Sequence, residues 1–430
     1  MPTCWCSAGS SSRDRATPRW SGPPCSTRRC RSCCCTRPGS RSRRAVRPGH
    51  VPPLDPGGSR WRRHPRGEGS EEVAVVRILQ IAPPWFTVPP TGYGGTEQVV
   101  ALLTDGLVEA GHEVTLVAAG GSVSRAELWT TGAEPPTTSL GDAVVELAHL
   151  LRGHRARARF DLVHDHTVLG AALAGVEAGP PVVHTLHGPW TPDHAALYRQ
   201  VADRVHLVAI SADQARRAPA DVPLAGVVHN AIDVERHPLV RAKGDHLAYV
   251  GRACAEKGPD VAIEVARRVG RPLRMAVKVN EASEQRYAVE VLRPAMAANP
   301  DVELVEVRSH ADKVALLGGA AAVLFPIRWP EPFGLVPLEA NACGTPVVAF
   351  ACGAVPEVVD DGRTAILVPP DDVAAMCDAV ERAVLLDPDA CRAHARARFD
   401  VPNLVRGYTA VYERVLAGVG PAAAATSAGR

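Results

Sequence analysis

Short β-branched runs alternate with longer amphipathic stretches from residue 76 to residue 368, and this alternation limits the fold more than any other feature. The first candidate strand, Val76 to Ala82, is followed by a candidate helix, Thr96 to Ala110, with apolar residues at helical spacing. Strands that alternate with helices are typical of a parallel sheet crossed by helices. Further strands are expected at Val114 to Ala118, Asp161 to His164, Val182 to Thr185, His206 to Ile210 and Gly226 to His229.

A second alternating set follows a polar connection, Val234 to Asp245. The two sets predict an α/β fold of two doubly wound Rossmann-like domains, residues 73–240 and 241–401, with a ligand-binding cleft between the carboxyl ends of their strands. A last helix, Pro402 to Leu416, has no strand after it, and residues 417–430 are expected to form a loose tail. In the second set, strands are expected at Leu247 to Val250, Leu273 to Val279, Val302 to Val305, Ala321 to Phe325, Pro346 to Phe350 and Ala365 to Val368, and helices at Pro259 to Val269, Glu284 to Ala298, Leu335 to Cys343 and Asp372 to Leu386.

Residues 1–72 differ in composition from the rest of the chain. Residues 1–70 hold fifteen Arg, no Lys and three acids, so they carry +12, whereas the whole chain carries +2. They contain one Leu, two Val, no Ile and no Phe, too little apolar surface to offset the entropy of folding. We expect this segment to be disordered, and a stretch upstream of the natural start, near Val73 or Val76, explains its composition most simply.

Cysteine usage gives no support for a metal or disulfide framework. Seven of the twelve cysteines lie in residues 1–70, three of them adjacent, and no His stands at metal-finger spacing from them. The other five are scattered among apolar neighbours, as reduced structural cysteines are. Because neither a secretory signal nor an apolar run of about 20 residues is present, we expect a cytoplasmic protein.

Two carboxylates flank a tight turn that opens a short helix, in the stretch from Trp329 to Pro346. Glu331 and Glu339 are separated by seven residues, and Phe333, Gly334 and Leu335 between them leave backbone amides free at the start of that helix. Carboxylates bind sugar hydroxyls, and helix-terminal amides favour phosphate oxygens. The pattern therefore predicts a sugar-phosphate site, although Glu331 could also cap the helix.

Arg252 and Lys257 lie five residues apart on a loop that leaves a strand, where a planar donor and a point charge can bracket a diphosphate. In the first domain, a glycine-rich loop containing Gly94 and Gly95 joins strand to helix. This loop is not Gly-x-Gly-x-x-Gly, and no acid is placed as the ribose partner of a nicotinamide site, which argues against a dehydrogenase. His184 and His187 end another strand, where α/β sheets expose functional residues.

These segments together resemble the family 4 retaining glycosyltransferases, which have the two-domain fold called GT-B. The resemblance rests on the Glu331 and Glu339 motif with its following Gly-Thr-Pro-Val-Val, and on the Gly-Arg-x-x-x-x-Lys-Gly element. It implies that Arg252 and Lys257 hold the diphosphate, that Glu331 and the amides of residues 333–335 hold the sugar, and that Glu339 binds the ribose. It also implies that Gly94 and Gly95 face the donor phosphates, and that His187 contacts the transferred sugar whereas His184 is a packing residue. Ser211 and Asn230 are expected near the cleft, and the last helix is expected to return to the first domain.

Two segments depart from that pattern. Lys278 lacks the Gly often found before it, and Gly353-Ala354 replaces a Gly-Gly pair. The turn Asp165-His166 and the preceding His164 resemble an active-site-facing strand end. Asp387-Pro388-Asp389 has the pattern of a helix end and is not expected to form a metal site.

The resemblance implies a retaining hexosyltransferase that uses a nucleotide diphosphate sugar as co-substrate, with no metal and no other cofactor. We expect no nucleic-acid partner. The acceptor is a small molecule or a cell-envelope precursor, and the second case would bring peripheral contact with a membrane. Two alternatives remain: a nucleotide-sugar 2-epimerase, which needs acid and base carboxylates beside the sugar, and a sugar-nucleotide-binding protein without catalysis.

Overall fold

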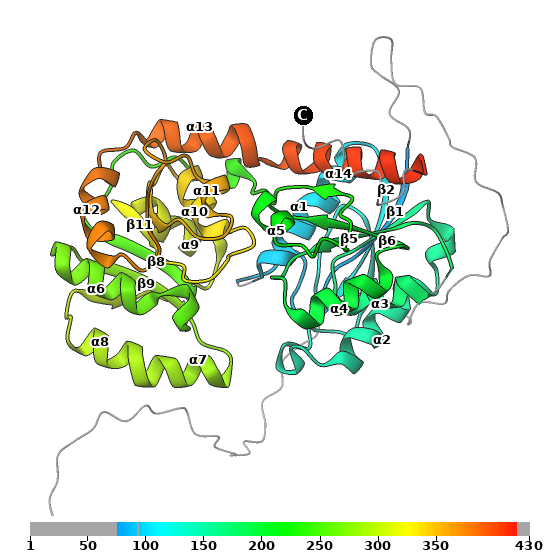
Figure 1. Cartoon of the computed structure of the whole chain (residues 1–430), viewed down its shortest axis with the longest axis horizontal. Helices are drawn as coiled ribbons and strands as arrows, with labels where there is room; N and C mark the ends of the chain where they lie inside the picture. The colour runs from blue at the N-terminus through cyan, green and yellow to red at the C-terminus, as the bar shows by residue number, and fades with distance from the viewer. Residues whose placement is uncertain (1–74, 93, 177, 419–430) are drawn as a thin grey trace, which may run out of the picture. The chain divides into compact units, whose positions relative to one another are not determined.

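The computed structural model describes residues 75–92, 94–176 and 178–418, all of which belong to one compact unit, Ser59–Arg430. The expectations for residues 1–72 and for most of the tail lie outside the described residues. The described part contains two parallel sheets crossed by helices (Figure 1). The α/β fold of two doubly wound sheets is therefore confirmed.

The first sheet has seven strands in the order β3-β2-β1-β4-β5-β6-β7, all parallel. The order reverses direction between β1 and β4, which are neighbours in the sheet, and this reversal marks the point where α/β sheets bind ligands. Its elements are β1 Arg77–Ile81, α1 Gly95–Glu109, β2 Glu113–Ala119, β3 Glu127–Thr131, α2 Ala143–His154, β4 Leu162–Asp165, α3 Val168–Val176, β5 Val182–Leu186, α4 Pro192–Val201, β6 Val205–Ala209, α5 Ala212–Arg216 and β7 Gly226–Val227, with short 3₁₀ turns at Thr137–Ser139, Arg157–Arg159 and Val234–Arg236.

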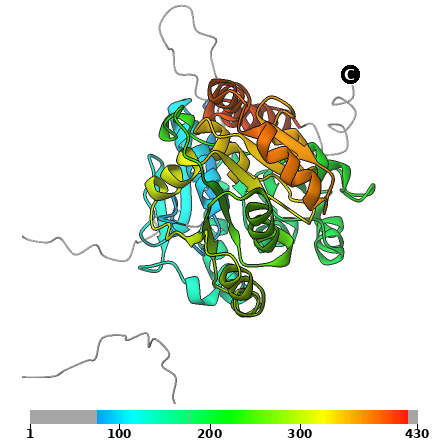
Figure 2. The same cartoon turned by 90° about the vertical axis from the view of Figure 1, so that its left-hand side faces the viewer.

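The second sheet has six parallel strands in the order β10-β9-β8-β11-β12-β13, with the reversal between β8 and β11. The orange helix α12 in Figure 2 packs against α6 and β13 on one face of this sheet. Its elements are β8 Leu247–Arg252, the 3₁₀ turn Ala255–Lys257, α6 Pro259–Val269, β9 Leu273–Lys278, α7 Ala282–Tyr287, a π-turn Ala288–Leu292, α8 Arg293–Ala297, β10 Val302–Leu304, α9 His310–Gly319, β11 Ala322–Phe325, α10 Leu335–Ala342, β12 Val347–Phe350, α11 Val355–Val358, β13 Ala365–Val368, α12 Val373–Ala383 and α13 Pro388–Phe399.

Strand side chains alternate between two apolar layers because successive residues of a strand point to opposite faces. In the second sheet, Val323 packs in the layer with α9, α10 and α13, whereas Leu324 packs in the layer with α6 and α12. In the first sheet, Ile78 packs in the layer with α1, whereas Leu79 packs in the layer with α2, α3 and α4. Both faces of each sheet are covered, which explains the nearly continuous apolar runs of the strands.

The last helix, α14 (Val401–Leu416), packs against α1 on the first sheet. The two helices approach closely at Gly106, where a Cβ atom would lie 2.5 Å from Cγ2 of Val405. Tyr408 and Tyr412 of α14 are buried in the same apolar layer as Ile78 of β1. The expectation that the last helix returns to the first domain is confirmed, since α14 belongs to the core of that domain.

Two expectations about local structure are confirmed with added detail. Asp387-Pro388-Asp389 lies at a helix end: Asp387 is the N-cap of α13, and its carboxylate accepts a hydrogen bond of 3.0 Å from the Asp389 amide. The helix expected from Glu284 to Ala298 is present as α7 and α8, and these two are joined by the π-turn Ala288–Leu292 shortly before Pro294. Proline lacks the amide hydrogen that a continuous α-helix would use there.

Candidate active site

Arg252 and Lys278 end two neighbouring strands of the second sheet. β8 and β9 pair in register, with Arg252 opposite Lys278, so both cations lie at the same edge. The Arg252 guanidinium lies 3.3 Å from Glu284 and 3.7 Å from Glu281, which begin α7. Burial lowers the pKa of Lys278; Glu284 opposes this shift and Arg252 adds to it. The structure therefore brings Lys278 next to Arg252, although its sequence context departs from the family pattern.

Lys257 lies on the turn after β8 and forms an ion pair with Glu331, which lies on the loop after β11. The Lys257 ammonium also lies 4.9 Å from the centre of the Trp329 ring. β8 and β11 are the two strands at the reversal point of the second sheet. The fold thus places the expected diphosphate and sugar residues together at the edge where such sheets bind ligands.

Glu331 does not cap α10. The N-cap of that helix is Gly334, and no side chain accepts a hydrogen bond there. Phe333 is buried in the core, and Leu335 begins the helix. The alternative role of Glu331 as a helix cap is therefore not seen, and its carboxylate is directed to Lys257 instead.

Glu339 lies in the second turn of α10 and is almost fully buried. Its Oε1 accepts a hydrogen bond of 2.6 Å from Nζ of Lys313 on α9. Its Oε2 has no hydrogen-bond partner among the described residues. A carboxylate held by one oxygen with the other free is suited to accept hydroxyl hydrogens, since a buried acceptor without a partner is costly.

The loop after β12 presses against the loop that carries Glu331. Gly353 has φ of +59°, and a Cβ atom there would lie 2.4 Å from the Glu331 amide nitrogen. Ala354 has φ of −80°, and its amide donates a hydrogen bond of 2.9 Å to the Glu331 carbonyl. Gly353 is therefore the position that requires glycine, and the replacement of a second glycine by Ala354 leaves the loop intact.

The glycine-rich loop of the first domain approaches the start of α10. Gly94 is the N-cap of α1, and a Cβ atom on Gly95 would lie 3.4 Å from the Leu335 side chain. Glu97, in the first turn of α1, is buried, and burial raises its pKa to about 7 while Lys278 opposes that shift. Sequence reasoning did not select Glu97, since a single acid at the start of a helix is common.

His187 follows β5 and shares a hydrogen bond of 2.9 Å between its Nε2 and Nδ1 of His166, which follows β4. Burial lowers the pKa of His187 to about 3, and it lowers the pKa of His166 well below its ordinary value. Both rings are therefore neutral near pH 7. The ring of His164 lies 4.0 Å from that of His166, and Nδ1 of His164 contacts the Tyr412 hydroxyl of α14 at 2.7 Å. Tyr412 of the last helix, α14, therefore helps to fix the end of β4.

Gln214 of α5 fixes the loop that carries His187. Its side-chain amide donates to the carbonyls of Leu186 and Gly188 at 2.8 and 2.7 Å. Its carbonyl oxygen accepts from the Ile210 amide, and Ser211 caps α5 by accepting from the Gln214 amide. The Ser211 side chain therefore serves as the N-cap of α5. Gln214 was missed because nothing in its neighbourhood in the sequence marks such contacts.

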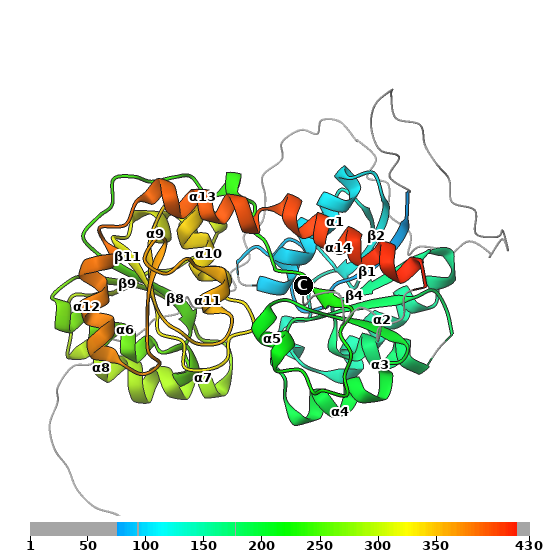
Figure 3. The same cartoon turned by 45° about the horizontal axis from the view of Figure 1, so that its top comes forward.

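Glu357 of α11, in the second domain, forms hydrogen bonds with residues of the first domain. Its carboxylate accepts hydrogen bonds from the Ala212 amide at 2.7 Å and from the Asp213 amide, and it lies 3.3 Å from Nε2 of His229. Figure 3 shows α11 beside α5, the helix that these two amides begin. Burial raises the pKa of Glu357, but the hydrogen bonds from His229 and the two amides outweigh it, so the pKa lies below its ordinary value. Asn230, next to His229, is buried, and its side-chain oxygen has no partner among the described residues.

Within residues 75–92, 94–176 and 178–418, no three His, Cys, Asp or Glu side chains are grouped so that they could hold a metal ion. The five cysteines in these ranges are free. None of the helices in the described part is both long enough and apolar enough to span a membrane.

Comparison with known proteins identifies the family. Residues 93–236 match the model of Glycosyltransferase Family 4, and residues 233–398 match that of Glycosyl transferases group 1. The chain belongs to the family 4-like GT-B glycosyltransferases. It is 29% identical over 374 residues to a glycogen synthase of Mycobacterium tuberculosis, a match that spans 75% of this chain and 89% of that one.

Two further similarities agree with this assignment. The chain is 30% identical over 300 residues to a D-inositol 3-phosphate glycosyltransferase of Mycobacterium bovis, a match that spans 60% of this chain and 62% of that one. The crystal structure of AviGT4, a glycosyltransferase involved in avilamycin A biosynthesis, superposes with a TM-score of 0.62 at 27% identity and covers 80% of this chain and 98% of its own. This glycosyltransferase is therefore similar in both fold and sequence to these proteins.

Proposed function

We propose that this glycosyltransferase moves a hexose from a nucleotide diphosphate sugar to an acceptor hydroxyl with retention of configuration. The observation that carries the proposal is the meeting of Arg252, Lys257 and Glu331 at the reversal point of the second sheet. The three side chains supply two cations and a carboxylate at one strand edge. The cations can pair with a diphosphate, and the carboxylate can accept hydrogen bonds from sugar hydroxyls.

In this proposal, charge stabilisation at the leaving diphosphate drives the reaction. Arg252 and Lys257 donate to the phosphate oxygens, and the free amides at the start of α10 add the positive end of a helix dipole. Glu331 accepts hydrogen bonds from the sugar hydroxyls, and Oε2 of Glu339 accepts hydrogen bonds from the ribose hydroxyls. His187 contacts the transferred sugar as a neutral ring, because burial holds its pKa near 3. The proposed activity needs no divalent metal.

The first test is binding of UDP and GDP by isothermal titration. Arg252→Ala should weaken the affinity by about 1.5 to 3 kcal/mol, since it removes charge-assisted hydrogen bonds. Arg274→Ala is the matched control, because Arg274 is exposed on β9 and pairs with Glu303 on β10. Equal affinity in the wild type and in Arg252→Ala would contradict the diphosphate assignment.

The second test follows the product. The anomeric configuration of the transferred hexose, read by proton NMR at early times, should equal that of the donor. Transfer should continue in EDTA, and an activity that disappears with EDTA and returns with manganese would overturn the metal-independent proposal. Conversion of the donor sugar without an acceptor would indicate the epimerase instead, and tight donor binding without any turnover would indicate a binding protein.

A further inference from the structure

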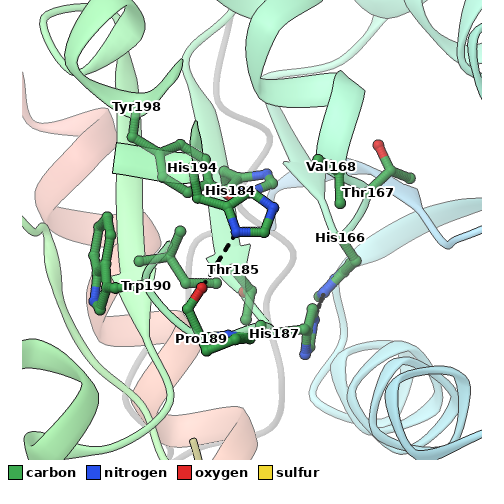
Figure 4. Close-up of a pocket in the computed structure, with 12 residues that line it drawn as sticks. His166, Thr167, Val168, His184, Thr185, His187, Pro189, Trp190, His194 and Tyr198 are labelled. Carbon is green, nitrogen blue, oxygen red and sulfur yellow. Dashed lines mark hydrogen bonds between the residues drawn. The ribbon is translucent and has the colours of Figure 1, made fainter. Parts of the chain in front are cut away.

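A cavity of about 60 Å³ lies in the first domain, between the carboxyl ends of β4 and β5 and the start of α4 (Figure 4). Its volume is a few times that needed by one water molecule, so it holds a hydroxyl-bearing fragment rather than a whole sugar ring. All of its lining comes from residues 166–198 of the first domain, and none comes from the donor segments of the second. The residues that line it are His166, Thr167, Val168, His184, Thr185, Leu186, His187, Gly188, Pro189, Trp190, His194 and Tyr198.

One buried polar atom at this cavity lacks a partner. Nε2 of His166 makes no hydrogen bond with any described residue, and the His166 side chain is more than nine-tenths buried. Both ring nitrogens of His184 face other side chains: its Nδ1 lies 3.5 Å from Oδ1 of Asp165, and its Nε2 contacts the Tyr198 hydroxyl. A buried polar atom without a partner is costly, so Nε2 of His166 points to a ligand that supplies a hydroxyl group.

Aromatic side chains form the part of the wall next to His184. The Tyr198 ring lies 5.7 Å from Trp190, 5.5 Å from His184 and 6.1 Å from His194, measured between ring centres. The Tyr198 hydroxyl contacts Nε2 of His184 at 3.2 Å, and the Trp190 indole N–H donates a hydrogen bond to the backbone carbonyl of Gln214. The wall is therefore fixed before any ligand arrives, which lowers the entropy lost on binding.

The cavity has no cation to receive an anionic group. None of the described residues that line it is Lys or Arg. Burial lowers the pKa of His166 and of His187, so these two rings are neutral near pH 7. A phosphate placed here would lose its water without gaining a positive partner and would approach the Asp165 carboxylate.

We propose that this cavity receives an uncharged, hydroxyl-bearing edge of the acceptor, and that the acceptor is therefore a neutral sugar or polyol rather than its phosphate ester. The inference rests on the proposed function, since it names the acceptor class for the same reaction. Nε2 of His166 bonds to an acceptor hydroxyl, and the aromatic wall packs against the carbon atoms of the same edge.

The experiment compares matched neutral and phosphorylated compounds: glucose with glucose 6-phosphate, and myo-inositol with myo-inositol 1-phosphate. Saturation-transfer difference NMR on the full chain measures their binding without a donor, and transfer from UDP-glucose or GDP-glucose gives kcat/KM. The neutral compound of each pair should be preferred by about tenfold or more, because burying an unpaired anion costs far more than burying a hydroxyl. Equal or stronger binding of the phosphorylated compounds, or no binding of the neutral ones, would overturn the inference.

Two variants locate the effect. His194→Ala opens the wall and should raise KM for the neutral acceptor without changing affinity for UDP, whereas His206→Ala, on β6 and away from the cavity, should change neither. Val168→Arg adds a cation at an exposed position of the lining and should improve use of the phosphorylated compound, with Val168→Gln as its uncharged control. If His194→Ala transfers the sugar with an unchanged KM for the acceptor, that result would contradict the inference. If the wild type bound neither UDP nor GDP, that result would contradict the proposed function. Acceptor binding is measured separately without a donor, so the two failures can be told apart.

Discussion

Lys257 and Glu331 form an ion pair between the turn after β8 and the loop before α10. Their side chains are only 17% and 14% exposed, so the pair is largely shielded from water. One residue is assigned to the diphosphate of the donor and the other to its sugar. The pair therefore fixes the distance between the two halves of the proposed donor site.

Removing either partner should destabilise the fold as well as the site. Lys257→Met and Glu331→Gln should each lower the free energy of unfolding by about 1 to 3 kcal/mol, because each leaves a partly buried group without its partner. The double variant should lose less than the sum of the two, with a coupling of about 0.5 to 3 kcal/mol. Urea unfolding of the four proteins measures this. Strict additivity would show that the ion pair contributes nothing to stability.

Lys313 should position Glu339 for the nucleoside. Lys313→Met and Glu339→Gln should both weaken binding of UDP and of UMP, because the ribose is common to the two ligands. The double variant should bind no worse than Glu339→Gln, since Lys313 acts through that carboxylate. Arg308→Ala is the control for charge, as Arg308 is exposed just before α9. Titration calorimetry decides: weakened binding of UDP with normal binding of UMP would place Glu339 on the diphosphate instead.

Gly353 should tolerate no side chain. Gly353→Ala places a Cβ atom against the Glu331 backbone at a positive φ, so we expect a loss of about 1 to 3 kcal/mol in stability and a displaced Glu331. Ala354→Gly, at the next position with ordinary φ, should cost less than about 1 kcal/mol and leave donor affinity unchanged. Thermal melting and UDP titration compare the two. Similar effects of the two substitutions would contradict the assigned role of the Gly353 loop.

The grouping of the proposed donor residues was predictable from the sequence because these residues lie in two short segments. Glu331, Phe333 and Glu339 lie on one loop and one helix, and Arg252 and Lys257 follow one strand. A local pattern is enough to place such residues at a strand end. The partners Lys313, Glu284 and Gln214 were missed because each makes its contacts to another element, where no local spacing reports them.

β3 and α13 are among the elements that the sequence did not predict, and both are buried only in part. β3, Glu127–Thr131, is an edge strand with no fully buried side chain, so its sequence lacks the apolar run of the other strands. α13 buries only Cys391, His394, Ala395 and Phe399, a stripe that is mostly small or polar. Hydrophobic periodicity is the main signal for secondary structure, and it is weak where burial is shallow.

The buried histidines make stability depend on pH, and His166 is the place to test this. Its pKa lies well below the ordinary value of 6.5, because it is buried and because His164, His187 and His184 face it. The unfolded chain therefore takes up a proton at His166 below about pH 6.5, whereas the folded protein does not, so stability must fall as the pH falls through that range. His164 and His187, whose pKa values are also lowered by burial, add to the same slope. His166→Asn removes one titrating group and should make the fall less steep by up to about 1.4 kcal/mol per pH unit, even if the variant is less stable at pH 8. Urea unfolding of the two proteins between pH 8 and pH 5 gives both slopes, and parallel curves would show that His166 is protonated in the folded protein as readily as in the unfolded chain.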